Sequence, residues 1–215
     1  MLVCVMASRK GGAGKTTLAS HLSVEAERIG AGPVAVIDLD PMGGLAAWWD
    51  SRKGATPVLA RVETTLADTL AALEAGGFRV VFVDTAPSIG ADVAEAVSAA
   101  TVCVVPVKPS PDDLRAVGRT VDVITRAKKP MIFALNMTKP RTRLTAEAAV
   151  ALSQYGTLAP TFVADRTDYA AAKSDGLTAQ ELEPGGKAAE EMRTLWEYIA
   201  RRAALAEEVS DVVAA

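Results

Sequence analysis

Short apolar runs alternate with segments of helical periodicity along the whole chain. Most of these runs are apolar at every position rather than at every second one, which is typical of strands buried on both faces of a sheet. The strands predicted in this way are Leu2–Ala7, Val34–Asp38, Val80–Asp84, Val102–Pro106, Met131–Leu135 and Leu158–Val163, with Val58–Val62 as a weaker candidate.

The segments between the runs carry apolar residues at the spacing of helices that pack on a core. Strands that alternate with helices favour a mostly parallel, twisted sheet covered by helices on both faces, so the predicted fold class is α/β. Ligands of such sheets bind at the carboxyl ends of the strands, where functional residues are therefore expected. The predicted helices are about Lys15–Ile29, Leu66–Ala75, Ala91–Ala99, Asp112–Ala127, Thr145–Tyr155 and Gly186–Ala206.

The composition narrows the class of protein. The chain has 215 residues, of which 50% are hydrophobic and 23% are charged, and we expect one domain over residues 1–215 with a sizeable core. The net charge of −3 argues against a globally basic nucleic-acid binder but leaves room for a local basic patch.

Signals for secretion or membrane insertion are missing from the sequence. No apolar run approaches the ~20 residues that span a bilayer, and no basic region precedes the first apolar run. A cytoplasmic location is therefore expected. Cys4 and Cys103 lie in strand-like runs and are interpreted as buried, reduced thiols, which together with the single His21 make no metal site.

The clearest chemical motif follows the first predicted strand, where residues 10–17 read Lys-Gly-Gly-Ala-Gly-Lys-Thr-Thr. Glycines allow a tight turn whose N–H groups converge on phosphate oxygens, and the following helix adds the positive end of its dipole. In the general phosphate-loop pattern Lys15 reaches the β- and γ-phosphates of ATP, and the Thr16 hydroxyl binds Mg²⁺. Arg9 replaces the first glycine of that pattern and Lys10 adds a second lysine, so the loop is a deviant form. Its predicted nucleotide-binding residues are Lys10, Gly11, Gly12, Ala13, Gly14, Lys15, Thr16 and Thr17.

Three aspartates follow two of the predicted strands. Asp38 and Asp40 are residues i and i+2 of an extended chain and point the same way. One is placed to hold a Mg²⁺-bound water and the other to orient the attacking water; the alternative is that an aspartate caps a turn or a helix near Leu45–Arg52. Asp84 follows four apolar residues, as in a Walker B element, and is expected to contact Mg²⁺. The predicted metal ligands are Thr16, Asp38 and Asp84.

Two further strand ends carry polar residues. The proline-rich loop Pro106–Asp113 is stiff, and its sequence is as compatible with pure architecture as with dimer or switch contacts. Asn136 is placed either to hydrogen-bond an adenine edge or to serve as a turn residue. Trp48 and Trp49 are interpreted as core residues rather than as a surface for a partner.

Together these motifs resemble the deviant Walker A ATPases of the ParA/MinD group. The resemblance covers nearly the whole chain and is strongest to the small, ParF-like members of the ParA branch, which lack an N-terminal helix-turn-helix domain. It implies a single P-loop ATPase domain that uses ATP and Mg²⁺ and acts as a dimerising switch. The motifs that carry it are Lys10–Thr17, Asp38-x-Asp40-Pro41 and apolar-Asp84-Thr85-x-Pro87.

The resemblance also implies roles for single residues. Lys10 matches the signature lysine that reaches across the homodimer interface to the partner's phosphates. Such a lysine acts like an arginine finger, which can raise the rate of hydrolysis by ~10³–10⁵. Lys15 and Asp40 complete the implied catalytic set, with Asp40 positioning the hydrolytic water. Asp38 matches the magnesium-side neighbour of Asp40, and Thr17 matches the residue at the α-phosphate.

ParA relatives bind double-stranded DNA without sequence preference as ATP-bound dimers, and a ParB-type centromere-binding adaptor stimulates hydrolysis and release. The resemblance therefore implies plasmid or chromosome partition by a cytoplasmic protein that associates with the nucleoid when ATP is bound. Alternatives are positioning of a protein cargo over the nucleoid, a MinD-like membrane ATPase, or a metabolic ligase of the same fold.

The C-terminal region bears on the choice between DNA and membrane. The tail Arg201–Ala215 is acidic and lacks aromatic anchors, so no membrane contact is expected. A solvated helix face is at least as good an interpretation of any single basic residue here, but phosphate contacts act collectively. The candidate DNA contacts are Lys173, Lys187, Arg193, Arg201 and Arg202.

Overall fold

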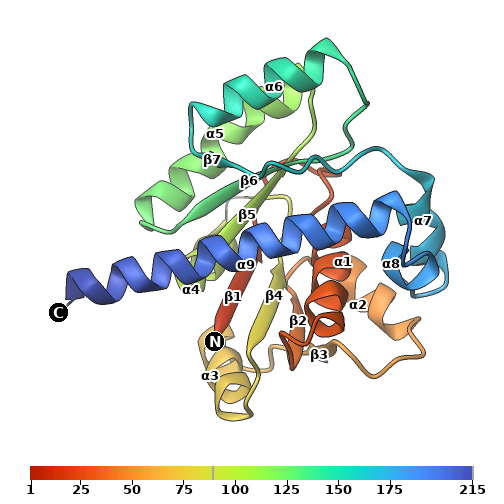
Figure 1. Ribbon diagram of the computed structural model, residues 1–215. Helices are drawn as coiled ribbons and strands as arrows, with labels where there is room; N and C mark the ends of the chain where they lie inside the picture. Colours follow the sequence, from red (N-terminus) through yellow and green to blue (C-terminus); the bar gives the residue numbers. More distant parts are fainter. Residues whose placement is uncertain (89, 215) are drawn as a thin grey trace.

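One parallel sheet runs through the molecule (Figure 1). The computed structural model describes residues 1–88 and 90–214, with side chains through residue 204, and within them the sheet has seven strands. These are β1 Leu2–Met6, β2 Val34–Asp38, β3 Val58–Ala60, β4 Val80–Asp84, β5 Val102–Val107, β6 Met131–Leu135 and β7 Thr157–Leu158. Their order is β3-β2-β4-β1-β5-β6-β7, and each neighbouring pair is parallel.

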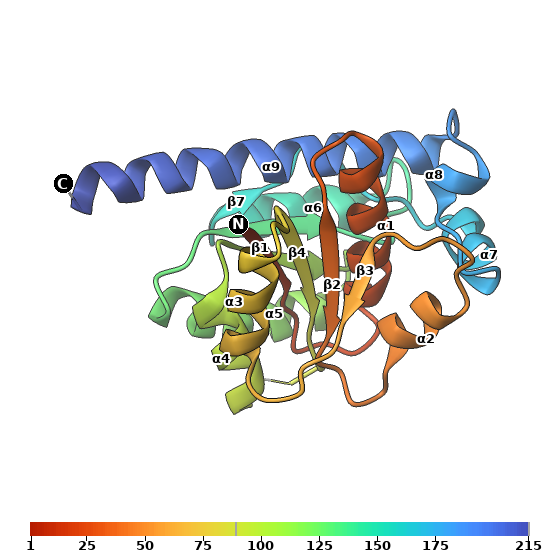
Figure 2. The ribbon, with the colours of Figure 1, turned by 90° about the horizontal axis from the view of Figure 1, so that it is seen from below.

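Helices cover both faces of this sheet, as Figure 2 shows. They are α1 Lys15–Arg28, α2 Gly44–Asp50, α3 Leu66–Ala75, α4 Ala91–Ala99, α5 Pro111–Arg126, α6 Arg143–Ser153, α7 Thr167–Ser174, α8 Ala179–Leu182 and α9 Lys187–Ala214. Alternate strand residues point to opposite faces, so two separate clusters form. Cys4 and Phe82 pack with α1, α2, α7, α8 and α9, whereas Val5 and Val83 pack with α3, α4, α5 and α6.

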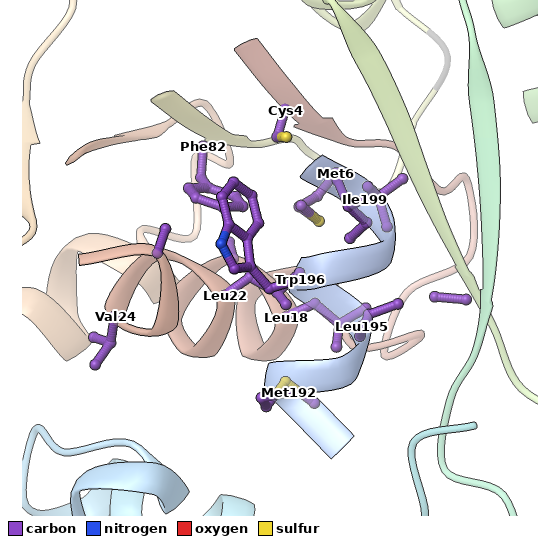
Figure 3. Packing of buried hydrophobic residues seen from close by; sticks show 14 of the residues in the cluster. Cys4, Met6, Leu18, Leu22, Val24, Phe82, Met192, Leu195, Trp196 and Ile199 are labelled. Carbon is purple, nitrogen blue, oxygen red and sulfur yellow. The ribbon is translucent and has the colours of Figure 1, made fainter. Parts of the chain in front are cut away.

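The long helix α9 fixes α1 against the sheet. Trp196 of α9 is buried beside Phe82 of β4, with ring centroids 5.5 Å apart, and Leu18 and Leu22 of α1 lie next to them (Figure 3). Burial of such side chains stabilises the fold by about 1.5–3 kcal/mol each. Since α1 begins at the phosphate loop, this packing holds the loop on a rigid support.

The structure confirms the predicted α/β fold class and most of the predicted elements. Both cysteines are buried and free, and Trp48 is a core residue, whereas Trp49 is only half-buried. Within the described residues, none of the helices is long and apolar enough to cross a bilayer. The predicted acidic tail lies largely outside the described side chains, which end at residue 204.

One predicted strand, Leu158–Val163, is wrong beyond its first residue, because β7 ends at Leu158. The segment stays beside β6, since Ala159 N–H donates to Phe133 O at 2.8 Å and Val163 N–H to Leu135 O at 2.9 Å. Pro160 lies between these two bonds and has no N–H to continue the ladder.

Helices α7 and α8 were not predicted. A signal for α8 is present in the sequence, because Thr178 and Glu181 form a reciprocal capping box at its start.

Candidate functional site

The phosphate loop and the aspartates meet at one edge of the sheet. Asp84 at the end of β4 is aligned with Met6 at the end of β1 and with Asp38 at the end of β2. The residues that follow these strands therefore converge at the carboxyl edge, as expected for a ligand site in a parallel sheet.

The loop between β1 and α1 has the backbone of an anion-binding turn. Gly12 and Gly14 have φ of 71° and 101°, a left-handed conformation that favours glycine. The N-cap residue of α1 is Gly14, and no side-chain cap is found there among the described residues, so the first N–H groups of the helix are available to an anion.

Lys15 and Lys10 differ sharply in environment. Lys15 is buried, and its Nζ donates to Ser8 O at 3.2 Å. Burial lowers the pKa of Lys15, an effect that the carboxylates of Asp84 and Asp40 oppose. Lys10 is exposed at the start of the loop, with its backbone N–H bonded to Ser8 Oγ at 3.3 Å. Lys15 thus faces the acidic edge, and Lys10 lies at the surface.

Asp84 is fully buried with one oxygen unsatisfied. The Thr16 hydroxyl donates to Asp84 Oδ2 at 2.6 Å, whereas Oδ1 has no hydrogen-bond partner among the described residues. Burial raises the pKa of Asp84 to about 7; the Thr16 bond opposes this shift, and Asp38 adds to it. A buried carboxylate with a free oxygen beside a hydroxyl is an arrangement that a divalent cation relieves.

Asp38 and Asp40 build the loop that follows β2. Asp38 Oδ2 accepts the N–H groups of Leu45 and Ala46, both at 2.9 Å, and its Oδ1 accepts the Asp40 N–H at 3.0 Å. Asp40 Oδ1 accepts the exposed Met42 N–H at 3.0 Å. Asp38 therefore caps α2, the alternative that the sequence left open, and its place beside a metal stays a prediction.

The residues present are compatible with Mg²⁺ carried on a nucleotide. Among the described residues, no group of three or more His, Cys, Asp or Glu side chains could hold a metal ion alone. Thr16 Oγ1 and the free oxygen of Asp84 supply two hard oxygen donors, which suits an ion that takes its remaining ligands from phosphate and water.

Asn136 lies against the phosphate loop. Its Nδ2 donates to Ala13 O at 2.8 Å, and its Oδ1 accepts the Met137 N–H at 2.9 Å. A Cβ added at Gly14 would collide with Asn136 Nδ2, and the φ of 101° at this position is strained for residues other than glycine. The side chain thus ties β6 to the loop, a role that sequence reasoning missed because it joins residues 123 positions apart. Its contact with an adenine stays a prediction.

The five candidate DNA contacts do not form one cluster. Lys187 and Arg202 both lie on α9, about 22 Å apart at the helical rise per residue. Arg193 lies 3.7 Å from Glu25 in an ion pair, and Arg202 donates to Thr157 Oγ1 at 3.0 Å. Arg201 lies over the Tyr198 ring, whereas Lys173 is on α7. Any DNA surface that includes them all is therefore extended.

This fold, with a glycine-rich phosphate loop between β1 and α1 and carboxylates on the adjoining strand ends, defines a P-loop nucleotide-binding protein. Residues 4–61 match the model of the CobQ/CobB/MinD/ParA nucleotide binding domain. The chain is 32% identical over 197 residues to Maintenance of carboxysome distribution protein A of Halothiobacillus neapolitanus, covering 86% of this chain and 89% of that protein. The chain belongs to the ParA/MinD family of ATPases.

Two further comparisons extend this result. Protein IncC of Escherichia coli is 27% identical to the chain, over 93% of this chain and 69% of that protein. A putative plasmid partition protein from Borrelia burgdorferi, solved with AMPPNP, superposes with a TM-score of 0.74 at 13% identity, over 94% of this chain and 99% of that one. At that identity the superposition supports the fold alone.

Proposed function

We propose that this ATPase positions a protein cargo over the nucleoid by alternating between an ATP-bound dimer on DNA and a form released by hydrolysis. The observation that carries the proposal is the 32% identity, over most of both chains, to a protein named for maintaining carboxysome distribution. The cargo in this proposal is a protein assembly.

Nucleotide and metal are proposed to bind at the carboxyl edge of the sheet. Bound Mg²⁺·ATP supplies the phosphoryl group and a cation that neutralises the charge developing on it. Thr16 and Asp84 are proposed to hold the metal, and Lys15 the β- and γ-phosphates. Asp40 is proposed to orient the hydrolytic water, and Thr17 to bind the α-phosphate. The buried oxygen of Asp84, which has no hydrogen-bond partner in the described part of the chain, supports this assignment.

The exposure of Lys10 supports a site completed by a second subunit. Lys10 lies at the surface of the loop, away from the buried Lys15. We propose that it reaches the phosphates of a partner subunit, so that the ATP-bound homodimer is the active form. Lys10→Ala is expected to leave ATP binding largely intact and to prevent formation of this dimer.

Partition of a plasmid or chromosome is the second candidate function. It is favoured by the similarity to Protein IncC and to a relative named ParA from Rhizobium radiobacter, which is 30% identical over 60% of this chain. In that case the partner is a ParB-type centromere-binding adaptor, and the cargo is DNA.

The first test is binding to long, non-specific double-stranded DNA with ATP, with ADP and without nucleotide, over a salt series. Both candidate functions predict binding with ATP alone that weakens steeply with salt, because phosphate contacts release counterions. Replacing Arg201 and Arg202 by Ala is expected to weaken binding, with the exposed Arg115→Ala as a control. Absence of DNA binding in every state, with ATP-dependent dimerisation intact, would reject both.

The second test separates the two candidates in cells that lack the gene. Cargo positioning predicts that a protein assembly loses its regular spacing while plasmids and chromosomes are inherited normally. A raised rate of plasmid or chromosome loss, with assemblies in place, would instead establish partition.

A further inference from the structure

A third lysine points at the phosphate loop from a neighbouring strand. Lys108 is the first residue after β5, and β5 pairs with β1, from which the loop leaves. Its Nζ lies 3.8 Å from the point that a Cβ on Gly12 would occupy. The ammonium group of Lys108 therefore lies over the middle of the loop.

The backbone around Lys108 is held in place. Val107 O accepts the Asn136 N–H at 2.9 Å, and Lys108 O accepts the Ser110 N–H at 2.7 Å. Ser110 then caps α5, and prolines occupy positions 106, 109 and 111. The proline-rich loop therefore has little backbone freedom and holds Lys108 toward the phosphate loop.

Lys108 has no anionic partner in the described part of the chain. None of the ion pairs found there at 4.0 Å or less includes it, and its ammonium makes no side-chain hydrogen bond. The side chain is half-buried, so its charge is only partly solvated. A half-buried ammonium above a turn of backbone N–H groups is complementary to phosphate.

The position of Gly12 indicates which phosphate Lys108 meets. Thr17 and Lys15 belong to the start of α1, where the inner phosphates of a P-loop nucleotide lie. Loop residues before Lys15 run toward the outer end of the triphosphate. Gly12 is three positions before Lys15, and Lys108 is therefore on the outer side.

We propose that Lys108 binds the terminal phosphate of ATP within the same subunit and favours triphosphate over diphosphate. This inference rests on the nucleotide site of the proposed function and not on its cargo or its DNA. Neither the phosphate-loop motif nor the two aspartate motifs include this residue.

The test is the affinity of Lys108→Ala for AMPPNP and for ADP, each with Mg²⁺, by isothermal titration calorimetry. Loss of one charge-assisted hydrogen bond is expected to weaken AMPPNP binding about tenfold or more, while ADP binding stays nearly unchanged. Lys108→Arg, which keeps the charge, is expected to retain most of the preference for triphosphate. Lys129→Ala is the matched control, because Lys129 is also half-buried but precedes β6 at the opposite edge.

Three outcomes would overturn the proposal. Unchanged AMPPNP affinity means that Lys108 does not bind phosphate, and equal losses for both nucleotides mean that it does not select the terminal one. A loss seen only at protein concentrations where sedimentation finds a dimer assigns Lys108 to the partner's nucleotide. Lys15→Ala, which is expected to abolish binding of both nucleotides, reports separately on whether the site itself is correct.

Discussion

The ends of β2 and β4 carry aspartates that are neighbours in register yet differ in environment. Asp38, at the end of β2, has both carboxylate oxygens occupied by backbone N–H groups. Asp84, at the end of β4, is fully buried and has one oxygen without a hydrogen-bond partner among the described residues. Two aspartates at the same edge of the sheet therefore differ in hydrogen bonding: Asp38 binds the backbone of the following loop, whereas the side chain of Asp84, within the described part of the chain, does not.

The two carboxylates differ in how the protein compensates their negative charge. The negative charge of Asp38 is balanced inside the protein by the N–H groups that it orders, so it holds the β2–α2 loop without any ligand. Burial raises the pKa of Asp84 to about 7, although the Thr16 hydroxyl and the charge of Lys15 oppose the shift, and leaves a cost that a cation removes. Buried polar groups are usually hydrogen-bonded, so an unsatisfied carboxylate oxygen calls for an explanation, and a bound cation would supply one.

The largest effect is expected from Asp84→Asn. The pKa of Asp84 rises from 3.8 unfolded to about 7 folded, so between these values the folded protein keeps a proton that the unfolded chain releases. The stability of the metal-free wild type therefore falls as pH rises from about 4 to about 7, by up to about 4 kcal/mol. The variant lacks this penalty and is expected to be more stable than wild type at pH 8.

Urea unfolding of both proteins at pH 5 and pH 8 measures this difference, with the exposed Asp122→Asn as a control. Equal pH dependence in wild type and variant would contradict the raised pKa of Asp84. The same variant is expected to lose at least about a hundredfold in ATP hydrolysis, since a metal's stabilisation of the transition state amounts to several kcal/mol.

Asp38→Ala tests the other aspartate of the comparison, and it is expected to lower the stability of the protein rather than raise it. Removing the carboxylate leaves the N–H groups of Leu45 and Ala46 without their acceptor, and the free energy of unfolding is expected to fall by about 2–3 kcal/mol. Asp38→Asn keeps one acceptor oxygen and is expected to recover part of the loss. Both are measured by urea unfolding at pH 7 without nucleotide; an alanine variant as stable as wild type would show that the loop does not depend on Asp38.

The contrast also marks the limit of what the sequence predicts. The phosphate loop is predictable because glycine conformation and lysine chemistry act within eight consecutive residues. The capping role of Asp38 depends on where α2 turns back, seven and eight residues later, and the motif alone left it open. The end of β7 at Leu158 was readable from Pro160, a signal that the apolar run obscured.

Contacts between segments far apart in the chain could not be predicted from the sequence. The bond of Asn136 to Ala13 and the approach of Lys108 to Gly12 both need the strand order, which places β5 beside β1 and β6 beside β5. Periodicity predicts that strands exist but not which strands are neighbours.

Asn136→Ala extends the comparison to a third strand end, with an intermediate effect. The Nδ2 bond to Ala13 O is buried, and its loss is expected to lower the free energy of unfolding by about 1–2 kcal/mol. Because the amide holds the loop rather than one phosphate, affinities for ADP and for AMPPNP are expected to fall together in calorimetric titrations. Unchanged affinity for both, in a destabilised variant, would assign Asn136 to folding alone.

Asp40→Ala is expected to have the smallest effect on stability. Within the described residues its carboxylate makes one hydrogen bond, to the exposed Met42 N–H, so the free energy of unfolding should change by less than about 1 kcal/mol. Asp40 thus differs from both other aspartates, because it neither caps a helix as Asp38 does nor is fully buried as Asp84 is.

The same variant separates stability from turnover. If Asp40 orients the hydrolytic water, Asp40→Ala binds ATP, forms the dimer and hydrolyses slowly, so the ATP-bound dimer persists on DNA. Single-turnover hydrolysis and size-exclusion chromatography with ATP measure the two effects together. Normal hydrolysis in a stable variant would move the water-positioning role to another residue of the carboxyl edge.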